Sequence, residues 1–230
     1  MYFSSKDVFE FDNYNGLPVN PNYELSYTLL DRIYNVLDKA MNEHSRVLLF
    51  HLVLKFPARD NGIEIKYGAI SRFIEYYRQK IDSDQRRRFR EGKKISPLFR
   101  VHPTSFRYIW VREVTAQGHD HYHIFVLLNG QSYHKSGSRT NMDAGGLFAM
   151  ANDAWSKALE LEQGKNYGLV EFSDEMKQIN VHQLSDLTVT RYGKQMNQLQ
   201  DAFLWMSYLA KLDTKELNGG QFRNFGSSTK

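Results

Sequence analysis

The sequence predicts an α+β domain in which helices pack against a sheet that contains an antiparallel hairpin. Stretches with helical and strand patterns follow one another in the order helix, strand, helix, strand, strand, helix. The two adjacent strands, at 105–115 and 119–129, are joined by the short turn Ala116-Gln117-Gly118, which predicts that they pair. With 230 residues, 41% hydrophobic and 14% aromatic, the chain is long enough to bury one substantial core.

Composition excludes several kinds of site. The chain has no cysteine, so it has no disulfide, no zinc ribbon and no cysteine nucleophile. Residues 1–7 lack the basic and apolar regions of a signal peptide, and no apolar run approaches the ~20 residues of a spanning helix. We therefore expect a cytoplasmic protein without a membrane partner. The net charge of +4 and the pI of about 9.1 permit a polyanionic partner.

The first quarter of the chain predicts an arm, a helix and a strand. Residues 1–22 contain turn formers such as Asn15-Gly16 and predict an irregular N-terminal arm. Between residues 23 and 42 apolar residues recur at spacings of three and four, which is typical of an amphipathic helix. The apolar run 46–56 predicts a central strand. Its His51 is expected in the core or on a sheet face, although it could also face a site.

A second helix is predicted from about 68 to 89, and positive charge accumulates at its end. The cationic residues there are Arg86, Arg87, Arg88, Arg90, Lys93 and Lys94. Such a run is either a solvated helix face or a patch that contacts the phosphates of DNA, with an affinity that falls as salt rises. Both interpretations are open from the sequence.

Three histidines alternate where the 119–129 strand begins. Because side chains along a strand have a period of two, His119, His121 and His123 point to the same face. Neighbouring members lie about 6–7 Å apart at Cα, so two of them can share one divalent metal ion. Glu113 lies in the first arm of the hairpin and can stand beside His121 and His123 as a third ligand. The alternative is that these are polar side chains where strands leave the core.

The remaining elements are weaker, except for the helices. In chain order we predict a helix at 147–161, short strands or connections at 168–172 and 187–189, and a helix at 201–212 that starts near 195. Residues 23–217 are expected to form a single domain, and 218–230, with several glycines and serines, a flexible tail.

Tyr208 and Lys211 lie in the last predicted helix at positions i and i+3. Residues with this spacing share a helix face, about 5–6 Å apart at Cβ. A nearby ammonium favours a phenolate and can stabilise charge in the transition state of a phosphoryl transfer. The alternative is a structural tyrosine, since the chain has 14 tyrosines and many line amphipathic helices.

Taken together, these residues resemble the HUH endonucleases, the replication initiators and relaxases of rolling-circle elements such as phages and plasmids. In order, the chain has a hydrophobic strand at 46–56, the histidine–bulky apolar–histidine run His121-Tyr122-His123, and Tyr208-Leu209-Ala210-Lys211. The likeness spans roughly 45–226 and is greatest to the replication proteins of inoviruses and phage-like chromosomal or satellite elements.

The resemblance implies a central antiparallel sheet of about five strands flanked by helices, an RRM-like nuclease domain. It also implies that His121, His123 and Glu113 hold one Mg²⁺ or Mn²⁺. Tyr208 would attack the scissile phosphate and form a 5′-phosphotyrosine, assisted by Lys211. The implied activity is a site-specific, single-stranded DNA nickase and ligase that initiates rolling-circle replication.

The implied substrate is single-stranded or hairpin origin DNA, held by the cations at 86–94 and by aromatic side chains. No Gly-x-x-x-x-Gly-Lys-Ser/Thr loop occurs in the chain, so a host helicase and a host polymerase are expected partners.

The chain also departs from the family. The positions four residues from Tyr208 are leucines, so we expect a single nucleophile, for which Tyr192 is a rival. His119 could replace His121, although the bulky Tyr122 between the histidines favours His121 with His123. Two other functions are compatible with the sequence: a metal-dependent nuclease that uses water, and a non-catalytic DNA-binding regulator on the same fold.

Overall fold

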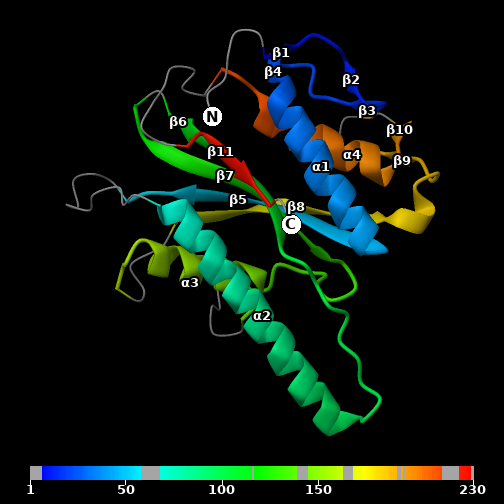
Figure 1. Cartoon of the computed structure of the whole chain (residues 1–230), viewed down its shortest axis with the longest axis vertical. Coiled ribbons are helices and arrows are strands. Elements are labelled where there is room, and N and C mark those ends of the chain that lie inside the picture. The colour runs from blue at the N-terminus through cyan, green and yellow to red at the C-terminus, as the bar shows by residue number, and fades with distance from the viewer. Residues whose placement is uncertain are drawn as a thin grey trace.

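The computed structural model describes residues 7–57, 68–115, 117–138, 145–162, 168–190, 193, 195–213 and 223–228. Its centre is a five-stranded antiparallel sheet with helices on both faces, as Figure 1 shows, and this confirms the predicted fold class. From edge to edge the strands are β11 (Phe225–Ser227), β6 (Arg107–Val114), β7 (Asp120–Asn129), β5 (Arg46–Lys55) and β8 (Val170–Asn180).

Two hydrophobic cores lie on the two faces of the sheet. The helices that cover one face are α1 (Tyr27–Glu43) and α4 (Gln198–Met206), and those that cover the other are α2 (Ala69–Ile95) and α3 (Leu147–Ala158). The central strand β5 is apolar on both sides for this reason: Leu49 packs under α1, and Phe50 packs on the α2 and α3 side. In the described part of the chain no helix is both long and apolar enough to cross a membrane.

Residues 7–22, predicted to be an irregular arm, are instead part of the packed structure. They form two small antiparallel ladders, of β1 (Val8–Phe9) with β4 (Leu25–Ser26) and of β2 (Asn13–Tyr14) with β3 (Leu17–Pro18). The turn formers Asn15 and Gly16 connect β2 to β3 with positive φ angles of 49° and 77°, which suits a two-residue hairpin turn. Tyr14 is buried in the core beneath α1.

Two strands of the main sheet differ from the predictions. β8 reaches Asn180, whereas only 168–172 was predicted as a strand, because polar residues alternate along this half-exposed edge strand. Residues 225–227, which fall in the predicted flexible tail, form β11 against β6. Gly226 lies opposite Trp110, and a Cβ there would come within 2.8 Å of the indole, so glycine permits this pairing. The strand predicted at 187–189 is β9 (Thr188–Val189), which pairs with β10 (Gln195–Met196).

The last helix ends earlier than predicted. α4 stops at Met206, and Ser207–Ala210 form a 3-10 turn, η4, before Lys211 becomes extended and pairs with Leu25. The pairing explains the change, because a helix continued through residue 211 could not pair with β4. The turn is held by the Ser207 hydroxyl, which accepts a hydrogen bond from the Asn20 amide at 2.9 Å. Residues i and i+3 eclipse in a 3-10 turn, so Tyr208 and Lys211 still share a face.

A test of the fold concerns Arg107, which is buried on β6 and donates to the Glu43 carboxylate at the end of α1, with Nε to Oε2 at 2.8 Å. This hydrogen bond lowers the pKa of Glu43 to about 2. A carboxyl with a lowered pKa stabilises the fold above its unfolded pKa, and the stabilisation is lost as pH falls from about 4.5 to 2. Glu43→Gln should lower the free energy of unfolding at pH 7 by about 1 kcal/mol, a figure discounted for partial exposure.

The difference between wild type and Glu43→Gln, measured by urea denaturation, should shrink as pH falls from 5 toward 2. Glu171→Gln is the matched control, because it removes only an exposed ion pair with Lys55. A difference that is constant from pH 7 to 3 would contradict the assignment.

Candidate metal centre and nucleophile

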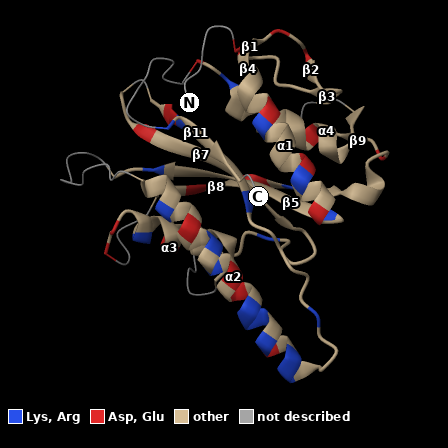
Figure 2. Ribbon diagram, in the orientation of Figure 1, with Lys and Arg blue, Asp and Glu red and all other residues tan. Residues whose placement is uncertain are grey.

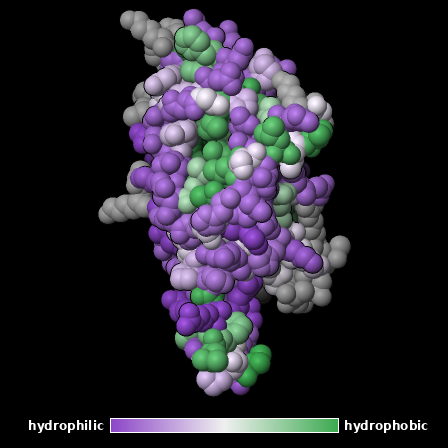
Figure 3. Space-filling view, turned by 90° about the vertical axis from the view of Figure 1, so that its right-hand side faces the viewer, coloured by the Kyte–Doolittle hydropathy of each residue, from purple (hydrophilic) through white to green (hydrophobic). Residues whose placement is uncertain are grey.

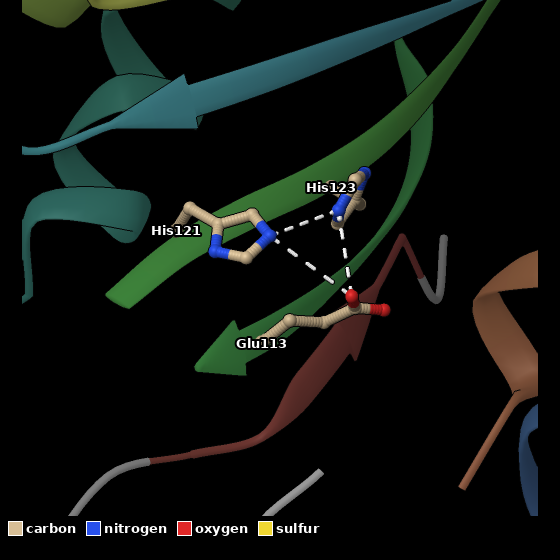
Figure 4. A group of neighbouring side chains, drawn as sticks. All are labelled: Glu113, His121 and His123. Carbon is tan, nitrogen blue, oxygen red and sulfur yellow. Dashed lines mark hydrogen bonds and ion pairs between the residues drawn. The ribbon is translucent and has the colours of Figure 1, made fainter. Parts of the chain in front are cut away.

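The pairing of β6 with β7 places three potential metal ligands together. In this register Glu113 lies opposite His121, and His123 is two residues further along the same face. Figure 4 shows the three side chains converging: His121 Nε2 is 3.1 Å from His123 Nε2, and Glu113 Oε2 is 3.5 Å from His123 Nε2 and 4.0 Å from His121 Nε2. Among the described residues, these are the histidines and carboxylates that could hold one metal ion.

The dimensions of this cluster suit a divalent cation. Metal bonds of about 2.1 Å to nitrogen and oxygen set ligand atoms about 3 Å apart when adjacent and about 4.2 Å when opposite. The three observed separations lie within this range. The other ring nitrogen of His121, Nδ1, is buried and has no hydrogen-bond partner in the described structure, so no hydrogen bond at Nδ1 orients this ring. A cation at Nε2 would supply that constraint.

His51 on β5 completes the surroundings of His123, a role that the sequence left open. Its Nε2 lies 3.0 Å from His123 Nδ1, and the two rings stack at an interplanar angle of 8°. Burial, followed by the repulsion of His123, lowers the pKa of His51 to about 3, so its ring is neutral. In the tautomer in which His123 Nδ1–H donates a hydrogen bond to His51 Nε2, the lone pair of His123 Nε2 points at the cluster.

Lys211 connects the metal-ligand cluster to Tyr208. Its Nζ donates to Tyr208 Oη at 2.6 Å and lies 3.0 Å from Glu113 Oε2. Burial alone lowers the pKa of Lys211, but the hydrogen bond to Tyr208 and the charge of Glu113 outweigh it and raise that pKa. The side chain is therefore an ammonium, and it places positive charge at the phenol oxygen.

The Tyr208 ring packs between residues from two other parts of the chain. Its centroid lies 5.8 Å from the His123 ring and 5.7 Å from that of Tyr23, with edge-to-face geometry in both pairs. Tyr208 is half-buried, so its hydroxyl belongs to the cluster without being sealed in the core. The structure thus brings together Glu113, His121, His123, Lys211 and Tyr208, the residues that the sequence analysis singled out as candidates.

Two rival residues are not part of this group. His119 is exposed, precedes β7 and is not among the clustered ligands, because the strand that would direct it to the common face begins only at Asp120. Tyr192 lies outside the described residues.

The six cations at the end of the second predicted helix are not at the metal-ligand cluster. They lie in the last part of α2, across the sheet from the α1 and α4 face that holds the cluster, and Figure 2 shows them along the end of α2 that projects from the body. Arg87 and Arg88 pair with Asp84, and Lys93 donates to the Pro97 carbonyl. The sequence predicted that this helix ends near Phe89, whereas α2 continues to Ile95. The position of the six cations relative to the metal-ligand cluster therefore did not follow from the sequence.

Comparison with known proteins identifies relatives over nearly the whole chain. The family model described as the YagK/YfjJ C-terminal domain matches residues 11–228. Two proteins of Escherichia coli strain K12, both described as uncharacterized, are similar. YagK is 32% identical over 206 residues, 86% of this chain and 90% of YagK, and YfjJ is 29% identical over 205 residues, 86% of this chain and 92% of YfjJ. No solved structure matches. With its family match over residues 11–228, the chain belongs to the YagK/YfjJ C-terminal domain family.

Proposed function

We propose that this protein is a metal-dependent DNA nickase that uses Tyr208 as its nucleophile. The observation that carries the proposal is the chain of contacts from Tyr208 Oη through Lys211 Nζ to Glu113 Oε2, which belongs to the same cluster as His121 and His123. The proposed nucleophile, a positive charge and the proposed metal ligands are therefore joined by direct contacts. The resemblance to HUH endonucleases supports the same assignment, since the order of these residues along the chain agrees with that superfamily.

Each side chain has a definable part in a strand-transfer reaction. Glu113, His121 and His123 would hold Mg²⁺ or Mn²⁺, which would polarise a non-bridging oxygen of the scissile phosphate. Tyr208 Oη would form a bond to phosphorus while the bond from phosphorus to the 3′ oxygen breaks. The phenol loses one proton and the departing 3′ oxygen gains one, so the products are a 5′-phosphotyrosine and a 3′-hydroxyl end.

Lys211 is the positioning and charge-stabilising residue in this scheme. Its ammonium contacts the phenol oxygen directly and stabilises negative charge that develops there during attack. Its second contact, to Glu113, holds the ammonium between nucleophile and ligands. The 3′-hydroxyl would prime a host polymerase, and reversal of the transfer would rejoin a strand. With no P-loop in the chain, unwinding is assigned to a host helicase.

The covalent intermediate can be tested directly. Incubated with Mn²⁺ and single-stranded DNA from its own replicon, the wild type should form a protein–DNA adduct on Tyr208, visible on a denaturing gel and located by mass spectrometry. Tyr208→Phe should abolish it because the nucleophilic oxygen is gone, and a chelator should abolish it in the wild type. Tyr27→Phe, which changes an exposed tyrosine on α1, is the matched control and should keep the adduct.

The other outcomes identify the alternatives. Cleavage that yields no adduct and survives in Tyr208→Phe would show a nuclease that activates water. An adduct that persists in Tyr208→Phe and disappears in Tyr192→Phe would move the nucleophile. Specific DNA binding with no cleavage, unaffected by chelator or by His121→Ala, would show a regulator.

The role of His51 can be tested through metal affinity. Because it orients His123 without being a ligand, His51→Leu should weaken Mn²⁺ binding by about 10–100-fold, the range found for partners of metal-bound histidines. His51→Gln retains an acceptor and should recover part of the loss. Isothermal titration calorimetry measures both dissociation constants, after circular dichroism has shown that each variant is folded.

The control for His51 is His119→Ala, which removes an exposed histidine of the same hairpin and should leave Mn²⁺ affinity unchanged. Equal losses in His51→Leu and His119→Ala would contradict the ligand set, and unchanged affinity in His51→Leu would contradict the orienting role.

A further inference from the structure

The last part of α2 extends beyond the core that its first part covers. The large apolar residues of this helix are buried up to Ile81, whereas between residues 82 and 95 the only buried residue is Gly92. At 1.5 Å per residue this extension is about 20 Å long, and Figure 1 shows it projecting from the rest of the molecule. Packing of α2 against the sheet therefore does not explain why the helix continues beyond Ile81. We call residues 82–104, the extension and the segment that returns along it, the arm.

The arm carries the net charge of the whole chain. Residues 82–100 contain seven Lys and Arg against three Asp and Glu, an excess of four, and the formal net charge of the full chain is +4. The remainder of the molecule is thus neutral in total. Positive charge concentrated on one projecting element is the electrostatic feature expected of a surface for a polyanion.

Three of these cations form a row that the protein itself does not neutralise. Arg86, Arg90 and Lys94 are exposed and spaced four residues apart, so they lie on successive turns of one helix face. Within the described structure they form no ion pair and no side-chain hydrogen bond, in contrast to Arg87 and Arg88, which pair with Asp84.

Beside this row is a groove with an aromatic side chain in its wall. The returning segment is fixed against α2 because Phe99 lies over Gly92, where a Cβ would come within 2.0 Å of the Phe99 ring. Between α2 and the returning segment lies a groove of about 530 Å³, and its lining includes Arg86, Phe89 and Arg90. Phe89 is 48% exposed although it is a large apolar ring. Figure 3 shows hydrophobic residues gathered at this lower end of the molecule.

We propose that the arm binds single-stranded nucleic acid, with Arg86, Arg90 and Lys94 contacting successive phosphates and Phe89 stacking on a base. Aromatic rings beside a row of cations are the features that bind a single strand without sequence preference, because every base has a face that can stack. This site is separate from the metal centre, which lies on the other face of the sheet. It would hold a part of the strand other than the part being cut.

The arm favours a single strand over two other occupants. In a duplex the base faces are stacked inside, so Phe89 would have no base to contact. An α-helix about 10–12 Å wide already fills a major groove of about 12 Å, and the returning segment adds to the width of the arm. A second copy of this chain would bring a second arm of the same charge, and like charges repel.

The experiment measures binding of fluorescein-labelled dT20 to the full chain by anisotropy, in EDTA so that metal-dependent cleavage does not occur. Removing three phosphate contacts, the triple variant Arg86→Gln, Arg90→Gln, Lys94→Gln should bind at least tenfold more weakly. The slope of log affinity against log salt should fall by about 2, at roughly 0.7 for each contact. Phe89→Ala should bind at least fivefold more weakly with an unchanged salt slope, because it removes stacking and no charge.

The matched control is Lys39→Gln, Arg78→Gln, Lys157→Gln, which removes the same charge from exposed positions on α1, α2 and α3 outside the arm and should change affinity less than twofold. Position 78 lies on α2 before the arm begins. Equal losses in the two triple variants would overturn the proposal, since net charge alone would then explain binding.

Equal affinity for dT20 and for the dT20·dA20 duplex, or an unaffected Phe89→Ala, would also overturn the proposal, in favour of a duplex surface. The proposal would also be overturned if the protein bound no DNA and its arm bound an acidic protein instead. The inference concerns binding without metal, so it stands or falls separately from the Tyr208 adduct, which requires metal.

Discussion

The candidate site depends on one constraint, the register in which β6 pairs with β7. A shift of one residue would turn His121 and His123 toward the core under α2 and α3 and bring Tyr122 into the site. Two features oppose such a shift. Both faces of β7 are buried beyond the histidines, so a shift would force its apolar side chains to repack in both cores. Arg112 and Asp120 form a buried ion pair, with Nε and Oδ1 at 2.7 Å, which a shift would separate.

The buried charge of Glu113 is balanced by a lysine from another part of the chain. Glu113 is only 2% exposed, and an isolated carboxylate at that depth would be strongly disfavoured. Lys211 supplies the opposite charge at 3.0 Å, but it is available only because the chain becomes extended after η4 and pairs with Leu25. The N-terminal segment thus helps to position residues of the candidate site. Asn20 holds the turn that carries Tyr208, by its hydrogen bond to Ser207. Leu25 of β4 pairs with Lys211, the lysine that balances the charge of Glu113.

Much of the site follows from local sequence patterns, whereas its surroundings do not. The period of two along 119–129 and the short turn before it were sufficient to place Glu113 beside the two histidines. Strand order was not accessible: His51 reaches His123 because β5 lies next to β7, a neighbour relation between residues 72 positions apart. The end of α4 was missed because apolar residues continue past Met206, and the long-range bridge to Leu25 decides the geometry there. β11 was missed because three residues with a central glycine carry no strand pattern alone.

The bridge between Leu25 and Lys211 has a consequence for the order in which the protein is completed. Chains emerge from the ribosome N-terminus first, at about 5–20 residues per second, so the ligands on β6 and β7 are synthesised well before the turn that carries Tyr208. Leu25, the N-terminal partner of this segment, is synthesised near the start, long before Lys211. A growing chain therefore contains the proposed metal ligands before Tyr208, the proposed nucleophile, has been synthesised. The proposed DNA cleavage would begin only after the N-terminal segment has paired with the segment that carries Tyr208 and Lys211.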